Sequence, residues 1–167
     1  MKVFTWFYGE PPKDMEVRQV YAIAFSADGR VLLKIKQTKQ GAIYTLAGGH
    51  IEKFDKDREE ALRREYVEEV NTTLQKDIHL IGYQEVREAK DVPVYAQIRM
   101  VAMIDKIGEN RPDLDGGEVY ERLLVSSKRA IKLLNWGRIG KQVVKGAVKI
   151  AKEKFGLKFT NKQEDFV

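Results

Sequence analysis

Two kinds of segment alternate along the chain, and this alternation limits the choice of fold more than any other feature. Runs rich in β-branched and apolar residues, typical of strands, are interleaved with segments whose apolar residues recur at helical spacing. A chain of 167 residues with this pattern is expected to form one α/β unit. The strands are expected within 17–36, at Tyr44–Ala47, Ile78–Glu88 and Val92–Asp105, and the helices at Asp57–Val70, Ser127–Leu134 and 138–155.

The segment from Val17 to Lys36 predicts a hairpin. Its two apolar runs, Tyr21–Phe25 and Val31–Ile35, flank a turn-forming Ser26–Gly29. With no internal repeat or linker in the chain, we expect a single domain over 1–167. Residues 1–16 are interpreted as an N-terminal extension, and the helix at 138–155 as a C-terminal one.

The composition excludes several classes of protein. Apolar residues make up 43% and charged residues 33% of the chain, a balance typical of a globular protein. The chain has no cysteine, so any metal must be held by oxygen or by histidine nitrogen, for which His50 and His79 are available. No apolar run approaches the roughly 20 residues that a membrane span needs. We therefore expect a cytoplasmic protein without a membrane partner.

The net charge of +5 is distributed unevenly. Between Ser127 and Lys158 there are ten lysines or arginines and one acid, Glu153. In the helix at 138–155, Lys141, Lys145 and Lys149 recur on one face. Such a basic helix can attract nucleic acid, although most basic runs are solvated helix faces.

Carboxylates border the apolar stripe of the helix that begins near Asp57. At about 100° per residue, Leu62, Tyr66 and Val70 form a stripe roughly 80° wide, and Glu69 lies only about 20° outside it. Glu65 lies about 40° further round, and Glu68 is just beyond. Three acids at this spacing repel one another beside a low-dielectric surface, so they need a counter-charge.

Two interpretations of this acidic edge are open. A hard divalent cation such as Mg²⁺ binds carboxylate oxygens and keeps positions free for phosphates. The alternative is a solvated edge that Arg58, Arg63 or Arg64 neutralises.

A resemblance to a known family favours the metal. The run Gly48-Gly49-His50-Ile51-Glu52, followed by Arg64-Glu65-Tyr66-Val67-Glu68-Glu69, resembles the box of the MutT-type Nudix hydrolases. The similarity covers about Val17 to Thr72 well. It implies the Nudix fold, a mixed β-sheet sandwiched between helices (α/β/α), here with a basic C-terminal helix extension.

The loop of the box departs from the family pattern. Five residues separate Gly49 from Asp55, which stands where the family has glutamate, and the loop carries one extra residue before Arg64. Either Asp55 or Asp57, or neither, takes the role of the loop carboxylate. Asn71 replaces the final glycine, which asparagine tolerates because it adopts a left-handed cap more readily than other side chains.

The resemblance also implies roles for individual residues. Glu65, Glu68 and Glu69 would bind Mg²⁺ or Mn²⁺ with a backbone carbonyl at Gly48 or Gly49, and Arg64 would orient Glu65 and Glu52. The implied substrate contacts are Gly48, Gly49 and Glu52. The implied catalytic residues are Glu65, Arg64 and Glu118, with Glu65 as the first candidate base and Glu118 or Glu121 as the second.

The implied function is a Mg²⁺- or Mn²⁺-dependent pyrophosphohydrolase that acts on a nucleoside diphosphate linked to another moiety. The alternative is an inactive Nudix-fold module that senses a nucleotide or binds nucleic acid. A prenyl diphosphate isomerase on this fold would need a cysteine, which the chain lacks. A second copy of the chain is a further expected partner. The aromatic residues available to stack on a base are Trp6, Phe7, Tyr8, Tyr83 and Trp136.

Overall fold

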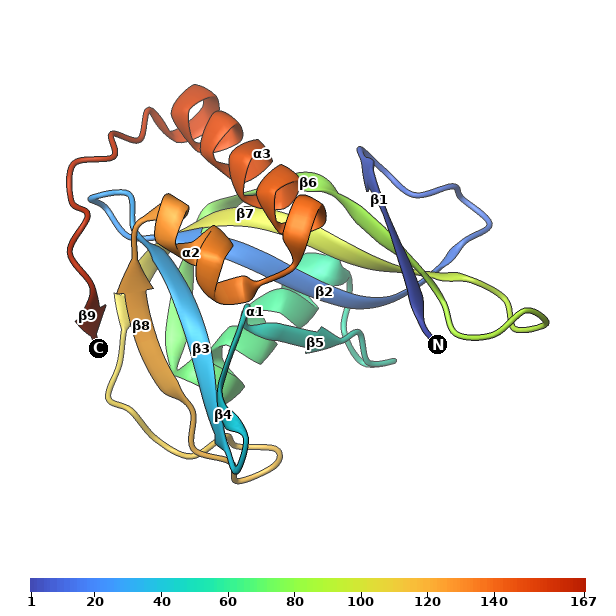
Figure 1. Ribbon diagram of the computed structural model, residues 1–167, viewed down its shortest axis with the longest axis horizontal. Coiled ribbons are helices and arrows are strands. Elements are labelled where there is room, and N and C mark those ends of the chain that lie inside the picture. Colours follow the sequence, from blue (N-terminus) through green and yellow to red (C-terminus); the bar gives the residue numbers. More distant parts are fainter.

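A mixed sheet of nine strands lies between α1 on one face and α2 and α3 on the other (Figure 1). The structure is a computed structural model that describes residues 1–167. The strands are β1 (Val3–Tyr8), β2 (Glu16–Phe25), β3 (Val31–Thr38), β4 (Gly41–Thr45), β5 (Gly48–His50), β6 (Thr72–Arg87), β7 (Tyr95–Ile107), β8 (Glu121–Val125) and β9 (Asp165–Phe166). The helices are α1 (Arg58–Val70), α2 (Ser127–Leu134) and α3 (Gly137–Phe155). The expected α/β/α arrangement is confirmed.

Side-chain alternation in the central strands divides the interior into two cores. In β2, Ala22 and Ala24 face α1, whereas Ile23 and Phe25 face α2 and α3, and all four are fully buried. Successive residues of a strand point to opposite faces, so one apolar run supplies both layers. Strand β2 therefore lies at the centre of the molecule, between its antiparallel neighbour β3 and the parallel β7.

The predicted hairpin at 17–36 is only partly correct. Both strands and the turn form, but β2 and β3 pair at a single position, Phe25 with Val31. The cause is β5, which pairs with β2 from Gln19 to Tyr21 and so occupies the edge that β3 would otherwise use. Strand β3 diverges and pairs instead with β4 and β8.

The Gly48-Gly49 pair lies within a strand and not after one. The strand predicted at Tyr44–Ala47 is only partly correct: β4 ends at Thr45, Leu46 and Ala47 lie between the strands, and the glycines begin β5. Gly48 has φ +142°, and a Cβ there would overlap the carbonyl oxygen of Val20. Only glycine allows the chain to run this close to β2.

Besides β5, three strands were not predicted from the sequence. Strand β1, within the N-terminal extension, pairs with β6 along its whole length and forms one edge of the sheet. Strands β8 and β9 form the other edge. Strand β6 begins at Thr72, six residues before the predicted Ile78, because the chain turns directly from α1 into the sheet.

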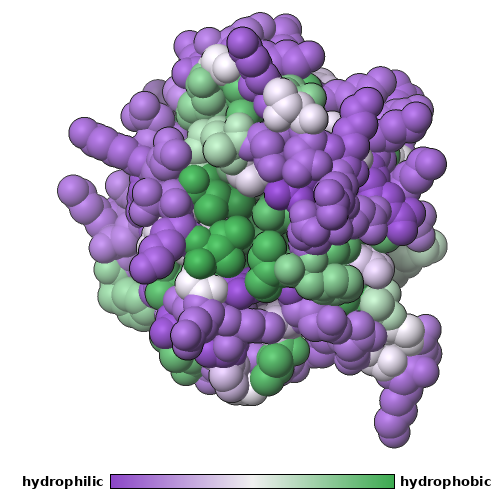
Figure 2. All heavy atoms as spheres, turned by 90° about the vertical axis from the view of Figure 1, so that its left-hand side faces the viewer, coloured by the Kyte–Doolittle hydropathy of each residue, from purple (hydrophilic) through white to green (hydrophobic).

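The C-terminal helices cover one face of the sheet and carry the basic residues outward. Val143, Val144 and Ala147 of α3 are fully buried, whereas Lys145 and Lys149 are exposed. In Figure 2, hydrophilic residues cover the upper part of one side of the molecule, and a hydrophobic patch lies in the middle of that side. No helix has the length and apolar character that crossing a membrane requires.

The last residues fold back on the body of the protein. Arg122 of β8, which is 3% exposed, donates hydrogen bonds to the carbonyl oxygens of Val167, Val70 and Gly108 at 2.8–2.9 Å. One guanidinium thus joins the chain end, the end of α1 and the loop that follows β7.

The β2–β3 turn holds the C-terminal segment through Asp28. Its carboxylate accepts hydrogen bonds from Arg30 at 3.0 Å, Ser26 at 2.6 Å and Asn161 at 3.1 Å. Burial alone would raise the pKa of Asp28, but these hydrogen bonds outweigh it and lower the pKa to about 2. The ionised carboxylate therefore stabilises the folded state.

Asp28→Asn is expected to lower the free energy of unfolding by about 1 kcal/mol at pH 7, since the side chain is one-third exposed to screening. Because the folded-state pKa is depressed, this stabilisation is present above the ordinary pKa of 3.8 and is lost as the pH falls toward 2. Urea unfolding at pH 7 and pH 3 should show a deficit roughly half as large at the lower pH. An equal deficit at both values would contradict the assignment.

Candidate active site

Helix α1 presents the acidic residues, and its two caps set its limits. The Asp57 side chain accepts a hydrogen bond from Glu60 N at 2.8 Å, and Asn71 ends the helix with φ 44° and ψ 49°. Both predicted caps are confirmed. Asp57 is therefore committed to capping and is not the loop carboxylate of the box.

The predicted apolar stripe packs on β2 and its neighbours. Leu62 and Tyr66 are fully buried and Val70 is 2% exposed. The Tyr66 hydroxyl donates to Ala22 O at 2.9 Å, which fixes the rotation of the helix against the sheet. Glu69 lies at the border of the stripe and is only 8% exposed.

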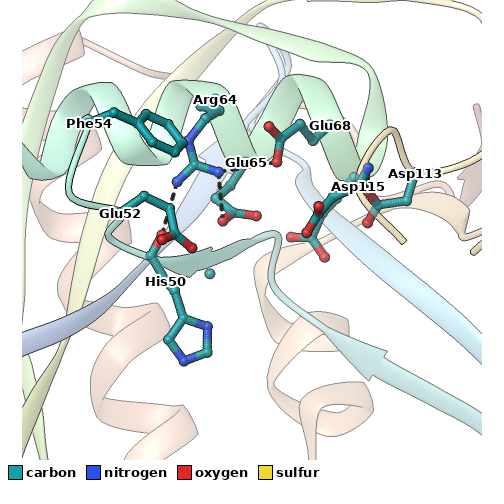
Figure 3. A pocket seen from close by; sticks show the side chains of 10 residues that line it. His50, Glu52, Phe54, Arg64, Glu65, Glu68, Asp113 and Asp115 are labelled. Carbon is teal, nitrogen blue, oxygen red and sulfur yellow. Dashed lines mark hydrogen bonds and ion pairs between the residues drawn. The ribbon is translucent and has the colours of Figure 1, made fainter. Parts of the chain in front are cut away.

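Arg64 is the centre of the hydrogen-bond network at the site. Its guanidinium donates to both oxygens of Asp55, at 3.0 and 2.8 Å, and to Glu65 and Glu68, each at 3.1 Å. Its fifth bond, 3.0 Å, goes to the carbonyl oxygen of His50 (Figure 3). Of the arginines that could neutralise the acids, Arg64 alone contacts Glu65 and Glu68.

Asp55, and not Glu52, is the loop partner of Arg64. The Asp55 side chain is 2% exposed and also accepts a hydrogen bond from Glu52 N at 2.8 Å. The Glu52 carboxylate is exposed and makes no hydrogen bond with Arg64, so the expectation that Arg64 orients Glu52 is wrong. The extra residue of the loop is accommodated because the shorter aspartate reaches the guanidinium.

Arg64→Lys is expected to reduce activity by about 10- to 100-fold, because an ammonium group cannot make the forked contact to Asp55. Steady-state kinetics checks this, with Arg58→Lys as the control. Arg58 lies on the same helix as Arg64 but outside the pocket, and it also donates two hydrogen bonds to one carboxylate, that of Glu10. Equal activity of the two variants would remove the positioning role from Arg64.

Two of the glutamates have raised pKa values. Burial raises the pKa of Glu65 to about 7, opposed by Arg64 and reinforced by Glu69 and Glu68. Burial also raises the pKa of Glu69, although Lys34 and a 2.8 Å hydrogen bond from Gly48 N stabilise its charged form. The buried end of the cluster therefore binds protons more readily than exposed carboxylates do, because burial disfavours the charged form.

Gly49 lies directly against Glu65. A Cβ at Gly49 would approach the Glu65 carboxylate to 2.7 Å. The backbone of β5 and the carboxylates of α1 are thus in contact, and a side chain at Gly49 would displace Glu65.

The loop between β7 and β8 brings two further acids to the cluster. A pocket of about 440 Å³ is lined by Gly49, His50, Glu52, Phe54, Arg64, Glu65, Glu68, Glu69, Asp113 and Asp115 (Figure 3). The loop is held to α1 by a hydrogen bond from Leu114 N to Glu68 O at 3.4 Å. Asp113 and Asp115 were not identified from the sequence, where nothing links their loop to α1.

Glu118 and Glu121 do not line this pocket. Glu118 is exposed and accepts hydrogen bonds from Lys36 at 2.7 Å and from the Tyr120 hydroxyl at 2.5 Å. Glu121 accepts from Gln37 at 2.6 Å. The structure thus corrects the choice of loop acid: Asp113 and Asp115 stand at the pocket in place of the expected Glu118.

The histidines take no part in the acidic cluster. The His50 ring points away from the carboxylates (Figure 3) and accepts a 3.2 Å hydrogen bond from the Gln19 amide. His79 packs against Phe155.

The side chains that line the pocket offer the oxygen ligands that a hard divalent cation prefers. Its acids are all carboxylates, two of them with pKa values raised by burial, and Arg64 is the one cation in the lining. No three acidic or histidine groups meet at one point as the side chains lie. The reason is that Arg64, Lys34 and Gly48 N take up the carboxylate oxygens.

Comparison with known proteins agrees with this geometry. The family model described as NUDIX domain matches residues 15–145. No curated protein matches the sequence. A Nudix hydrolase from Nitrosomonas europaea is 18% identical with a TM-score of 0.58, over 88% of this chain and 93% of that one.

Two further solved structures share the fold. The C. elegans Ap4A hydrolase has a TM-score of 0.51 and 19% identity, over 82% of this chain and 100% of that one. The Bacillus subtilis pyrophosphohydrolase BsRppH has a TM-score of 0.53 and 22% identity, over 65% of this chain and 63% of that one. The chain therefore matches less than two thirds of the length of BsRppH.

The fold, the acidic edge of α1 and the family match together define the class of protein as one built on a Nudix domain. The matched region contains α1, its caps and the loop acids. The chain belongs to the Nudix family.

Proposed function

We propose that the chain is a Mg²⁺- or Mn²⁺-dependent pyrophosphohydrolase that cleaves the diphosphate of a nucleoside diphosphate linked to another moiety. The observation that carries this proposal is the gathering of Glu65, Glu68 and Glu69 with Asp113 and Asp115 around one pocket (Figure 3). A pocket with so many acids repels a diphosphate unless cations intervene, so the substrate class and the metal requirement support each other.

Glu65, Glu68 and Glu69 would hold the metal, with a backbone carbonyl of Gly48 or Gly49. When bound, the metal would neutralise the diphosphate oxygens and lower the pKa of the attacking water. The close approach of Gly49 to the Glu65 carboxylate supports this assignment, because it places the β5 backbone beside a carboxylate in the lining of the pocket.

Glu65 is the first candidate for the general base. Its carboxylate lines the pocket, lies against Gly49 and accepts a hydrogen bond from Arg64, so it is placed to accept the proton of a water bound in the pocket. Water adds to one phosphorus as its proton passes to Glu65, and the bridging P–O bond breaks, which leaves two phosphomonoesters. Asp113 and Asp115 are the second candidates, and Arg64 positions Glu65.

A substrate panel tests the proposal. Nucleotide sugars, ADP-ribose, dinucleoside polyphosphates and nucleoside triphosphates are incubated with the chain in Mg²⁺, in Mn²⁺ and in EDTA, and the products are separated by ion-exchange chromatography. We expect metal-dependent release of a nucleoside monophosphate from at least one class. Absence of hydrolysis in both metals, with salt-sensitive nucleic-acid binding, would favour the inactive binding module instead.

A further inference from the structure

A buried arginine on the far side of β5 has no acidic partner. Arg99 of β7 is 5% exposed and donates only to neutral oxygens: Gln84 Oε1 at 2.5 Å, Gln97 Oε1 at 3.1 Å and Ile98 O at 3.3 Å. Its Nε is buried and has no acceptor within the chain. Burial lowers the pKa of Arg99 to about 10, so the group stays charged at neutral pH. A buried cation without a counter-charge destabilises a fold, which points to a function for Arg99.

Arg99 lies in the wall of a small aromatic cavity. The cavity measures about 320 Å³ and is lined by Phe4, Gln84, Gln97, Arg99, Trp136 and Ile139. The guanidinium carbon lies 5.6 Å from the centroid of Trp136 and 4.6 Å from that of Tyr21. Phe4 is 43% exposed, so the cavity opens to the surface. Ligand pockets usually measure about 300–1,000 Å³, so this one suits a single flat ring system.

The polar groups of this cavity present hydrogen-bond donors. The side-chain oxygens of Gln84 and Gln97 both accept from Arg99, and the Gln97 amide donates to Gln19. The Gln84 amide nitrogen makes no hydrogen bond within the chain, and neither does Arg99 Nε, which is covered as the side chains lie. A ligand here must therefore offer acceptors. Paired acceptors on a flat ring are what guanine presents to an arginine through O6 and N7, whereas adenine presents a donor in place of O6.

The cavity adjoins the acidic pocket across β5. Tyr21, whose ring lies on Arg99, pairs with Gly48 of β5. His50, which lines the acidic pocket, is hydrogen-bonded through Gln19 to Gln97. The acidic pocket suits a diphosphate with its metal, and the Arg99 cavity suits a flat ring with acceptors. One molecule with a base at one end and a diphosphate at the other could occupy both.

We propose that the Arg99 cavity binds the base of the diphosphate substrate and selects guanine over adenine. This inference rests on the proposed function for the identity of the substrate. The flat ring lies between Phe4 and Trp136, and its acceptor edge receives hydrogen bonds from Arg99 and Gln84.

Fluorescence titration tests the inference without catalysis. The chain has two tryptophans. Trp136 lines the cavity, and Trp6 lies in β1 on the same face of the strand as Phe4, which also lines the cavity. GMP, AMP and inorganic phosphate are titrated separately in EDTA. We expect GMP to quench the fluorescence and to bind roughly 5- to 150-fold more tightly than AMP. Equal binding of GMP and AMP, or binding of phosphate alone, would overturn the proposal.

Substitution of Arg99 separates recognition from structure. Arg99→Met removes an unpaired buried charge, so we expect an unchanged or higher Tm and loss of the preference for GMP. Arg122→Met is the matched control: Arg122 is equally buried but joins three segments through backbone oxygens, so its loss should lower the Tm and keep the preference. If Arg99→Met does not fold, Arg99→Lys tests the role of Arg99 instead, because lysine keeps the charge but cannot donate two parallel hydrogen bonds. A preference for GMP that survives in the folded Arg99 variant overturns the assignment.

The two proposals fail in different ways. Metal-dependent hydrolysis without any guanine preference would overturn the role of the Arg99 cavity and leave the proposed function intact. Selective binding of GMP without hydrolysis of any diphosphate would do the reverse.

Discussion

Glu68→Gln is expected to lower the rate of diphosphate hydrolysis by about 10³-fold, equivalent to roughly 4 kcal/mol of transition-state stabilisation. Glu68 has the freest carboxylate of the α1 cluster: it contacts only Arg64, and its side chain is 24% exposed at the pocket. Glutamine keeps the size and removes the charge that would hold the metal. Steady-state kinetics in saturating Mg²⁺ and Mn²⁺ measures the loss.

Calorimetry with each metal shows whether that loss comes from weaker metal binding. Glu59→Gln is the matched control, because Glu59 lies on the same helix and outside the pocket. We expect its kinetics and metal affinity to equal those of the wild type. Wild-type activity in Glu68→Gln would remove Glu68 from the catalytic centre.

Gly48→Ala is expected to lower the free energy of unfolding by about 2–5 kcal/mol. The methyl group would overlap the Val20 carbonyl oxygen and lie 2.7 Å from Tyr21 Cα, so β5 would have to separate from β2. Glu69 would also lose the hydrogen bond from Gly48 N. Urea unfolding followed by circular dichroism measures the change.

Gly41→Ala is the control that separates the backbone strain of a positive φ from the steric overlap of the added methyl group. Gly41 also has a positive φ, +118°, but no atom lies within 4 Å of a Cβ placed there. We expect this variant to lose only about 1 kcal/mol, from backbone strain alone. Equal losses at the two glycines would show that close packing of β5 on β2 contributes nothing.

Local signals predicted α1 almost completely. Asp57 and Asn71 mark its ends through side-chain and backbone preferences that act within a few residues, and the structure confirms both. The acidic edge follows from helical geometry alone, since Glu65 and Glu69 lie one turn apart beside the buried Leu62 and Tyr66. Features of this kind can be read from one sequence because they depend on short-range spacing.

The remaining features depend on contacts between distant segments. Strand β5 pairs with the edge of β2, and this pairing explains why β2 and β3 diverge. No residue of the turn between β2 and β3 indicates the divergence. Asp113 reaches the pocket because the β7–β8 loop docks on the end of α1. A one-residue change of loop length left Asp55 ambiguous in sequence, and only its contact with Arg64 resolves the choice.

The three hydrogen bonds of Arg122 connect Val167 to the two segments that carry the acidic residues of the pocket. Val167 lies beside the end of the helix that carries the glutamates and beside the start of the loop that carries Asp113, because one guanidinium binds all three segments. Loss of the Val167 contact would therefore also loosen the Arg122 guanidinium that connects the end of α1 to the loop bearing Asp113.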